Sequence, residues 1–313
     1  MLRVVSRRLL SAVPLLLVVS VLSFVLGSFA PGNVAESMLG EGATPQAVAK
    51  LNHQLGLDQP LLQRYWDWLS AAFRGDLGSS TFSGQSVTSL ISDRLPVTLS
   101  LTVLALVISI VIGVAAGAVG AIFGGVVARI TDSVSVLMLS IPNFWLGTVM
   151  IAVFAVQFRL FPASGYVPFG NSPSAWISSL VMPVFCIAAV AIATIAMNTR
   201  SAMLAALRSD FVRSLRANGI PARSVLFKHV LRNAGGLVMT IVSMLFVGLL
   251  GGTVLMEQVF GMAGLGSLAT SATNQHDLPV VQGLVVLYTL IVIVVFALND
   301  VALAYLNPKV VMS

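Results

Sequence analysis

Charged residues are scarce in this chain of 313 amino acids. Only 9% of the residues are charged and 57% are hydrophobic, whereas about 25% of the residues of a typical soluble domain are charged. A chain of this composition has too few polar side chains to cover a water-exposed surface, which excludes a cytosolic enzyme. It also excludes a disordered protein, because disordered chains are rich in charge and poor in apolar residues.

Cysteine and lysine are nearly absent, and each shortage excludes a class of site. The single cysteine, Cys186, lies in an apolar stretch. It therefore forms no intrachain disulfide and no cysteine-based metal cluster, and we interpret it as a small buried hydrophobic residue. None of the three lysines (Lys50, Lys228 and Lys309) follows a glycine, as the P-loop of an ATPase requires. We predict no catalytic residue, cofactor or metal, and expect that the chain is not itself an enzyme.

Long apolar runs, by contrast, are abundant. A helix needs about 20 apolar residues to cross the hydrocarbon core of a bilayer. Six segments have this length, at residues 9–30, 99–123, 134–158, 177–197, 237–256 and 281–306. Proline inside them, such as Pro142 and Pro183, is expected to be tolerated, as it is in other membrane helices. The predicted fold class is an all-α integral membrane protein with six transmembrane helices.

The first apolar run resembles a signal peptide, because Arg3, Arg7 and Arg8 precede it. Its length of about 20 residues exceeds the roughly 7–15 residues of a signal-peptide core. We therefore interpret it as a retained membrane anchor.

The distribution of basic residues predicts the orientation of the chain. If the N-terminus is inside, the inner segments contain twelve of the 17 Lys and Arg residues, and seven of these lie between Arg200 and Arg232. Because Lys and Arg concentrate on the cytoplasmic side of membrane proteins, six spans place both termini in the cytoplasm. The net charge of +6 is then explained without nucleic-acid binding.

Ionisable residues are almost missing from the predicted spans. No histidine lies in a span, and among the acids only Glu257 and Asp300 lie near the ends of predicted helices. Proton-coupled carriers usually place ionisable groups at bilayer depth, so their absence argues against a proton-driven pump. It leaves open an ion-coupled secondary transporter that binds sodium through backbone carbonyls.

Residues 31–96 form a long outer segment whose pattern predicts three helices. Thr44 is suited to cap the first helix, Pro45 to begin it and Gly56 to end it. The second begins at Asp58, with five residues on one side: Leu62, Tyr65, Trp66, Leu69 and Phe73. The third contains Val87, Leu90, Ile91 and Leu95. Such a segment either packs against the bundle and the membrane surface or docks an external partner, and the pattern alone favours packing.

The inner loop at residues 200–234 predicts a helix, a sharp turn and a second helix. Leu204, Leu207, Phe211 and Leu215 recur with helical spacing and form one apolar stripe. Three arginines lie off this stripe: Arg208, Arg213 and Arg216. Gly219 provides a stop, because glycine adopts the left-handed conformation at helix ends, and Pro221 suits the first turn of the next helix.

Three functions of this basic loop are considered. It sets the topology of the chain, it is a helix-turn-helix that reads DNA, or it presents a short helix to a groove of a cytoplasmic partner. A loop that is tethered to the membrane at both ends is poorly suited to DNA. The pattern gives the topology and partner interpretations equal weight.

The loop carries a resemblance to a known family. Residues 210–219 (DFVRSLRANG) and 228–234 (KHVLRNA) resemble the loop of binding-protein-dependent ABC importer permeases, in the dipeptide/oligopeptide/nickel branch. Similar motifs occur in the expected order along nearly the whole chain, among them RRLL at residues 7–10, LGLDQP at 55–60, RGDLG at 74–78, SIPNFWLG at 140–147 and LFPASGY at 160–166. The long outer segment is similar to that of the first of the two permease subunits, the DppB/OppB type.

The resemblance implies a fold, a function and a set of partners. The fold would be that of a type I ABC importer permease, with the first helix and the outer segment in residues 1–96 and a five-helix permease core in residues 97–313. The chain would form the path for peptides or a similar small solute across the bacterial cytoplasmic membrane. Its partners would be a second permease (DppC/OppC-like), two cytoplasmic ATPase subunits, an extracytoplasmic solute-binding protein and membrane lipid. The ATPase-coupling residues would be Asp210, Phe211, Arg213, Arg216 and Gly219.

Overall fold

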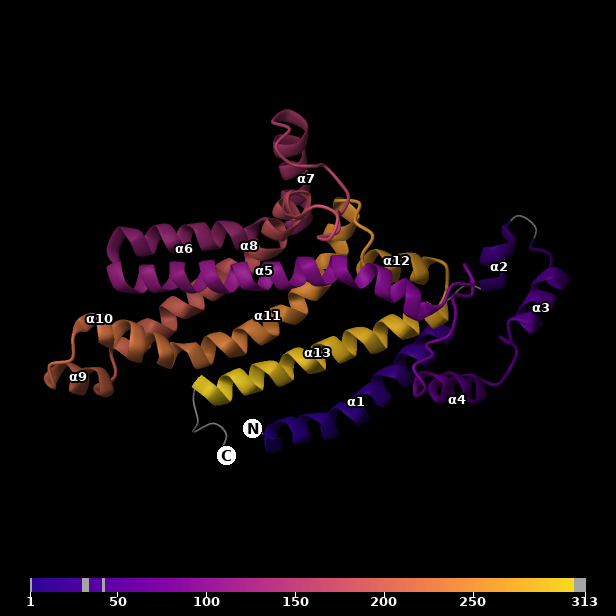
Figure 1. The fold of residues 1–313 in the computed structure, drawn as a ribbon, viewed down its shortest axis with the longest axis horizontal. Helices are drawn as coiled ribbons and strands as arrows, with labels where there is room; N and C mark the ends of the chain where they lie inside the picture. Colours follow the sequence, from indigo (N-terminus) through magenta and orange to yellow (C-terminus); the bar gives the residue numbers. More distant parts are fainter. Residues whose placement is uncertain (1, 30–33, 41–42, 307–313) are drawn as a thin grey trace. The chain divides into compact units, whose positions relative to one another are not determined.

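The computed structural model describes residues 2–29, 34–40 and 43–306, and this part of the chain is helical without any extended strand (Figure 1). The described residues fall into two compact units. The first unit consists mainly of Val97–Ala263, and the second contains Ser6–Pro96 and Gly264–Val294. The contacts described below lie within one unit or the other.

Four helices of the described chain are long and apolar enough to cross a membrane. They are α5 (Val87–Phe123), α8 (Pro173–Leu207), the helical run Ala222–Val259, and α13 (Leu278–Leu306). They confirm the second, fourth, fifth and sixth predicted spans. The first predicted span lies in α1 (Leu2–Ser28), whose part Ala12–Ser28 is apolar. The total of six spans stays a prediction.

The third predicted span is not a single straight helix. The chain forms α6 (Gly125–Ser140), α7 (Asn143–Met150) and the π-helical η2 (Ile151–Gln157). α6 and the continuous run of α7 and η2 meet at an angle of 95°. The break is at Ile141, which is extended at ψ 123°, directly before Pro142. Proline disfavours helical backbone in the residue that precedes it. The expectation that Pro142 is tolerated inside a helix was therefore wrong.

The core of the first unit is built around α8. Leu180, Ile187 and Cys186 of this helix are buried, and they pack in one cluster with Leu101 of α5 and Met256 of α11 (Leu231–Val259). The thiol of Cys186 lies 3.6 Å from the sulfur of Met150. The interpretation of Cys186 as a buried hydrophobic residue is confirmed.

Glycine allows α5 to approach α8 at backbone distance. A Cβ atom on Gly117 would lie 2.4 Å from the carbonyl oxygen of Ala196 and 2.7 Å from Cβ of Thr199, and one on Gly113 would lie 2.7 Å from Cβ of Ile195. Any side chain at these positions would force the two helices apart. This is the close packing for which small residues are used in membrane helices.

The second unit contains the outer segment. It has α2 (Val34–Leu39), α3 (Pro45–Gln54) and α4 (Leu61–Ala72) before α5 begins. α2 was not predicted. The backbone N–H of Ala47 donates to the hydroxyl of Thr44, and Gly56 has φ +65°, which confirms the limits of the first predicted helix, α3. The second begins at Leu61 instead of Asp58. The third is the first part of α5, which continues through Pro96.

The five residues expected on one side of the second outer helix lie within an arc of about 100°, but they differ in their contacts. Tyr65 packs against α1, while Leu62, Trp66 and Phe73 are exposed. The predicted side is therefore correct, but a stripe of apolar residues in the sequence does not show which of them contact protein.

A buried carboxylate ties the second unit together. Asp277 accepts hydrogen bonds from the hydroxyl of Ser80 and, at 3.1 Å each, from the backbone N–H and the hydroxyl of Thr81. It lies between α12 (Leu265–Asn274) and α13. Nearby, Gly283 of α13 leaves room for Val87 at the start of α5, since a Cβ atom on this glycine would lie 2.6 Å from Cγ1 of Val87. These contacts hold the outer loop at residues 78–86 against the start of α13.

Candidate coupling surface

The inner loop folds into a short separate helix, α9 (Asp210–Ala217). α8 ends at Leu207, and Ser209 is extended before α9 begins. This interruption shifts the helical register, so Val212, only 1% exposed, takes the buried position that the sequence assigned to Phe211. Phe211 itself is 38% exposed. The prediction of one continuous apolar stripe that includes Phe211 was wrong.

α9 ends in a well-formed Schellman turn. The N–H of Gly219 donates to the carbonyl of Arg216 at 3.0 Å, and the N–H of Ile220 donates to the carbonyl of Leu215 at 3.2 Å. Gly219 has φ +74°, the left-handed conformation that this motif requires and that glycine adopts without strain. The predicted stop at Gly219 is confirmed. The space around its Cα atom is open, so glycine is required here by the backbone and not by crowding.

The chain turns back into the membrane directly after this turn. Pro221 precedes α10 (Ala222–Ser224), which leads through the π-helical η3 (Val225–Val230) into α11. Val225 and Val230 are buried, and they pack in one cluster with Val212 of α9 and Met203 of α8. One side of α9 is therefore fixed to the ends of two membrane helices.

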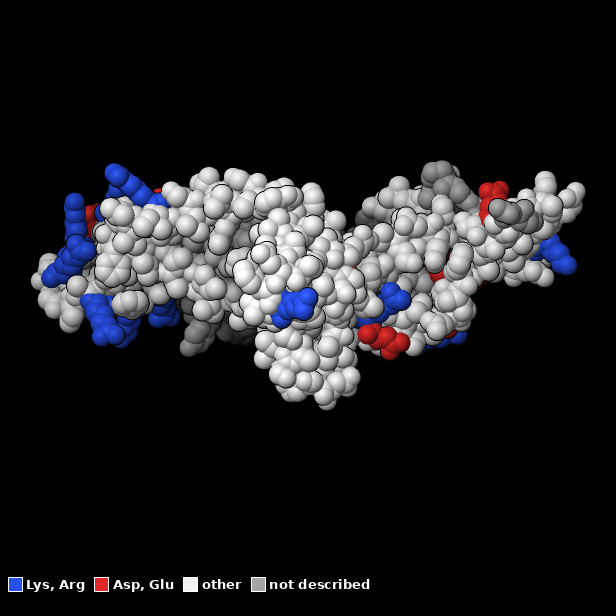
Figure 2. Space-filling model, turned by 90° about the horizontal axis from the view of Figure 1, so that it is seen from above, with Lys and Arg blue, Asp and Glu red and all other residues white. Residues whose placement is uncertain are grey.

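The other side of α9 is exposed and polar. The carboxylate of Asp210 and the guanidinium of Arg213 lie 3.6 Å apart, and both side chains are largely in solvent. Asp210 lies in the first turn and Arg216 in the last turn, where each charge stabilises the helix dipole. Phe211 is the large apolar residue of this exposed side. Lysine and arginine side chains gather over this end of the first unit (Figure 2).

An open cavity of about 510 Å³ lies on the segment that follows α9. It is lined by Pro221, Arg223, Ser224, Phe227 and Lys228. Phe227 is exposed although it is aromatic. The exposed side of α9 and this cavity together form what we call the coupling surface: Asp210, Phe211, Arg213 and Arg216 with the five cavity residues.

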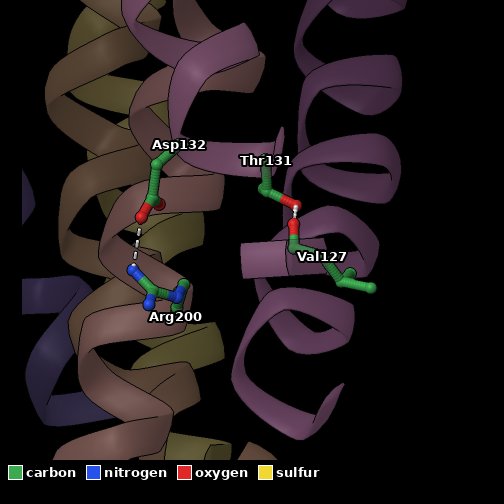
Figure 3. Close-up of polar contacts among 4 residues, drawn as sticks. All are labelled: Val127, Thr131, Asp132 and Arg200. Carbon is green, nitrogen blue, oxygen red and sulfur yellow. Dashed lines mark hydrogen bonds and ion pairs between the residues drawn. The ribbon is translucent and has the colours of Figure 1, made fainter. Parts of the chain in front are cut away.

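An ion pair that sequence reasoning missed lies at the base of the coupling surface. The guanidinium of Arg200 on α8 donates to the carboxylate of Asp132 on α6 at 2.8 Å (Figure 3). The two side chains are 27% and 39% exposed. Gly120 of α5 makes room for the pair, because a Cβ atom there would lie 3.2 Å from Cδ of Arg200. One feature of the sequence could have indicated this pair: Asp132 is one of only two acidic residues predicted on the inner side of the membrane.

Among the residues that the structure describes, no three His, Cys, Asp or Glu side chains gather as a metal site would require. The coupling surface combines a short amphipathic helix, a rigid turn and several cations. Such a surface is suited to contact a groove on a protein partner.

Two family models match the chain and together extend over nearly all of it. Residues 109–312 match the model described as binding-protein-dependent transport system inner membrane component. Residues 1–102 match the N-terminal model of the same kind of membrane component.

Several relatives are similar along their whole length. A peptide transport system permease protein of Brucella abortus (strain 2308) is 37% identical, with 98% of both chains aligned. A peptide ABC transporter permease protein of Sinorhizobium fredii (strain NBRC 101917 / NGR234) is 35% identical, again with 98% of each chain. A glutathione transport system permease protein of Escherichia coli (strain K12) is 34% identical, with 99% of each chain.

The fold is also similar to that of a solved transporter. Inward-facing structures of the MetNI methionine ABC transporter contain a chain that matches with TM-scores of 0.53 and 0.55 at 18% identity. The match includes 70% of the present chain and 96–97% of that chain. At this level of identity the likeness concerns the fold alone.

Proposed function

Because the chain belongs to the family of binding-protein-dependent transport system inner membrane components, we propose that it is the permease subunit of an ATP-driven importer for peptides. The observation that carries this proposal is the match along the whole chain to peptide and glutathione permeases. The names of these relatives favour a peptide as the transported solute. The proposal extends to other small solutes that are similar to peptides.

The importer needs partners that this chain does not replace. The sequence has no P-loop lysine, so ATP hydrolysis belongs to separate cytoplasmic subunits, and the family description itself names a binding protein. We propose that the path forms between this chain and a second, homologous permease. Each permease would receive one ATPase subunit on its inner loop.

The coupling surface is the proposed contact with the ATPase. Val212 anchors α9 to α8 and η3, so a force on its exposed side passes to two membrane helices. Asp210, Phe211, Arg213 and Arg216 supply the contact, and Gly219 sets the angle at which the chain leaves α9. ATP drives the transport cycle only if it binds the outward-facing and inward-facing states of the transporter with different affinity. Movement of α9 would transmit the change between these states from the ATPase to the membrane helices.

This function is tested by reconstituting the complex in vesicles with its sister permease, both ATPases and the binding protein. We expect uptake of a labelled dipeptide or tripeptide that requires ATP and the binding protein and persists when ionophores collapse ion gradients. Uptake by the isolated chain, driven by a sodium or proton gradient, would instead support the ion-coupled carrier.

Orientation is tested separately with single cysteines in a Cys186→Ala background. Cysteines at the exposed positions Ser37 and Ser83 should react with a membrane-impermeant thiol reagent added to intact cells, and one at exposed Ser214 should not. Ser80 is unsuitable for this experiment because it is buried against Asp277. Reaction at Ser214 would refute an inner location of α9.

A further inference from the structure

The outer helix α4 has one face that packs against α1. The hydroxyl of Tyr65 lies 2.8 Å from the hydroxyl of Ser20, and the ring of Tyr65 meets the ring of Phe24 edge to face at 5.4 Å. The guanidinium of Arg64 lies 5.8 Å above the same Phe24 ring. Both helices belong to the second unit. This face is therefore held by specific contacts.

A second face of α4 is apolar, and its large side chains are exposed within the described part of the chain. Leu62, Trp66 and Phe73 are 83%, 68% and 78% exposed. At 100° of rotation per residue these three side chains lie within about 40° of one another on the helix. Large apolar residues gathered on one exposed stripe indicate a surface that meets another apolar phase. We call these three residues the apolar stripe.

A third face is polar. Gln63, Asp67 and Ser70 are exposed, and their rotation places them beside the apolar stripe and away from the face that packs on α1. α4 is thus divided into a protein-facing side, an apolar side and a polar side. A helix buried under a protein partner has no need of this division, whereas a helix that lies between hydrocarbon and water requires it.

The contact with α1 locates α4 at membrane depth. If α1 crosses the membrane with its N-terminus inside, as proposed above, the hydrocarbon begins after Arg8 and 20 residues bring it to Ser28. Ser20, which contacts Tyr65, lies eight residues before Ser28, or about 12 Å deeper at 1.5 Å per residue. The packing face of α4 therefore lies at the level of the outer leaflet and not above it.

α1 itself exposes apolar side chains at the same depth. Val18, Val21 and Leu22 are 56%, 41% and 54% exposed, as lipid-facing residues of a membrane helix are. The apolar stripe of α4 adds to this surface at the same level. Trp66 is also the residue type that favours the boundary between hydrocarbon and headgroups.

We propose that α4 is an interfacial helix that lies in the outer leaflet of the membrane. Its apolar stripe, Leu62, Trp66 and Phe73, contacts lipid acyl chains, and Gln63, Asp67 and Ser70 contact headgroups and water. The lipid partner holds the outer segment at a fixed height beside the first span.

The test uses spin labels on single cysteines in the reconstituted complex, in a Cys186→Ala background. The variants Leu62→Cys, Trp66→Cys and Phe73→Cys report on the apolar stripe, and Gln63→Cys, Asp67→Cys and Ser70→Cys are the matched controls. Vesicles of phosphatidylethanolamine and phosphatidylglycerol supply the lipid. Power saturation measures the collision of each label with oxygen, which concentrates in hydrocarbon, and with a water-soluble nickel chelate.

We expect oxygen to dominate at the three stripe positions and nickel to dominate at the three controls. Equal nickel access at both sets would overturn the proposal, because α4 would then lie in water. Low access to both reagents at the stripe would also overturn it, because a protein would then cover the stripe. Peptide uptake by each labelled variant verifies that the complex is folded.

A second measurement does not depend on labels. Lipids brominated at a shallow acyl position should quench the tryptophan fluorescence of the wild-type complex more than that of Trp66→Phe, and an equal loss would contradict the proposal. Reaction of Asp67→Cys with an impermeant thiol reagent from outside the vesicles tests the orientation independently. A failure of the proposed orientation is thereby distinguished from a failure of the lipid contact.

Discussion

Two short amphipathic helices of this chain, α9 and α4, differ in what they leave exposed. α9 anchors one side with Val212 and exposes Asp210, Arg213 and Arg216 beside a single aromatic residue. α4 anchors one side with Tyr65 and exposes a stripe of three large apolar residues. α4 is fixed to α1, and α9 is fixed to α8 and η3.

The difference shows that the exposed side of a helix, not its amphipathicity, indicates its partner. Charged groups retain their hydration on a polar surface and give specificity to a protein contact. Exposed leucine, tryptophan and phenylalanine gain most from transfer out of water. Both helices have an amphipathic pattern of apolar residues in the sequence. This pattern indicates that one side of each helix is buried, but it does not indicate what the other side contacts.

The largest effect is expected from breaking the turn that holds α9. Gly219→Val places a β-branched residue at φ +74°, at a strain of about 1–3 kcal/mol. We expect normal membrane insertion but loss of ATPase recovery and of peptide uptake, measured by co-purification and by vesicle transport.

Two variants control for this prediction. Gly84 has φ +70° and open space around it, as Gly219 does, so Gly84→Val imposes similar strain in the outer loop and should leave ATPase recovery intact. Gly219→Asn should retain more activity than Gly219→Val, because asparagine tolerates the left-handed conformation. Full ATPase recovery with Gly219→Val would show that the loop serves topology alone.

A smaller effect is expected at the base of the coupling surface. Asp132→Asn removes the charge that faces Arg200 at 2.8 Å, and a hydrogen bond to a charged group contributes about 1.5–3 kcal/mol, less for a partly exposed pair. We expect more ATP to be hydrolysed per peptide transported, because α6 and α8 are then less firmly joined. The exchange of both residues, Asp132→Arg with Arg200→Asp, should recover part of the coupling, and an unchanged ratio in Asp132→Asn would exclude this role.

The exposed charges of α9 should contribute less to stability than to recognition. The pair of Asp210 and Arg213 is solvated, so Asp210→Ala should change the free energy of unfolding by less than about 1 kcal/mol. Arg216→Glu reverses a charge on the exposed side and should weaken ATPase binding several-fold, with a strong dependence on salt concentration. An insensitivity of ATPase binding to both variants would indicate that Phe211 and the cavity residues make the contact.

The smallest effect is expected in the outer segment, at the turn between α3 and α4. The imidazole of His53 lies 2.6 Å from the carboxylate of Asp58, which raises the pKa of His53 and lowers the pKa of Asp58. The contribution of the raised histidine is lost as pH rises through its folded pKa, and that of the lowered aspartate is lost as pH falls through its folded pKa. The pair is therefore strongest between about pH 4 and pH 6.5.

Both side chains are exposed, so loss of the pair should change stability and activity only slightly. The titration of His53 by NMR should shift toward its ordinary pKa in Asp58→Asn, while peptide uptake remains unchanged. A large change in uptake would indicate that this turn takes part in docking.

The sequence predicted best those features that depend on one residue and its neighbours. The cap at Thr44 and the left-handed turns at Gly56 and Gly219 follow from the chemistry of single residues, and all three are present. The long apolar spans depend on composition over about 20 residues, and four of them form as predicted. The buried state of Cys186 followed from the same composition.

Features that depend on tertiary contacts were not predictable. Pro142 breaks a helix, whereas Pro183 stays inside α8, where it is buried among neighbouring helices. The interruption at Ser209 moved Phe211 out of the buried stripe and Val212 into it. The pair of Arg200 and Asp132 joins residues 68 positions apart, and no local pattern indicates such a pairing. The roles assigned to the coupling surface stay predictions until its contact with an ATPase is measured.

The contact between Gly117 and the backbone of Ala196 has a consequence for how the transporter moves. With no side chain between them, α5 and α8 lack the flexible layer that lets packed helices shear past one another by rotamer changes. These two helices should therefore travel as one rigid body, with α9 fixed near its inner end. We expect a movement of α9 to tilt α5 and α8 together rather than to slide one helix along the other.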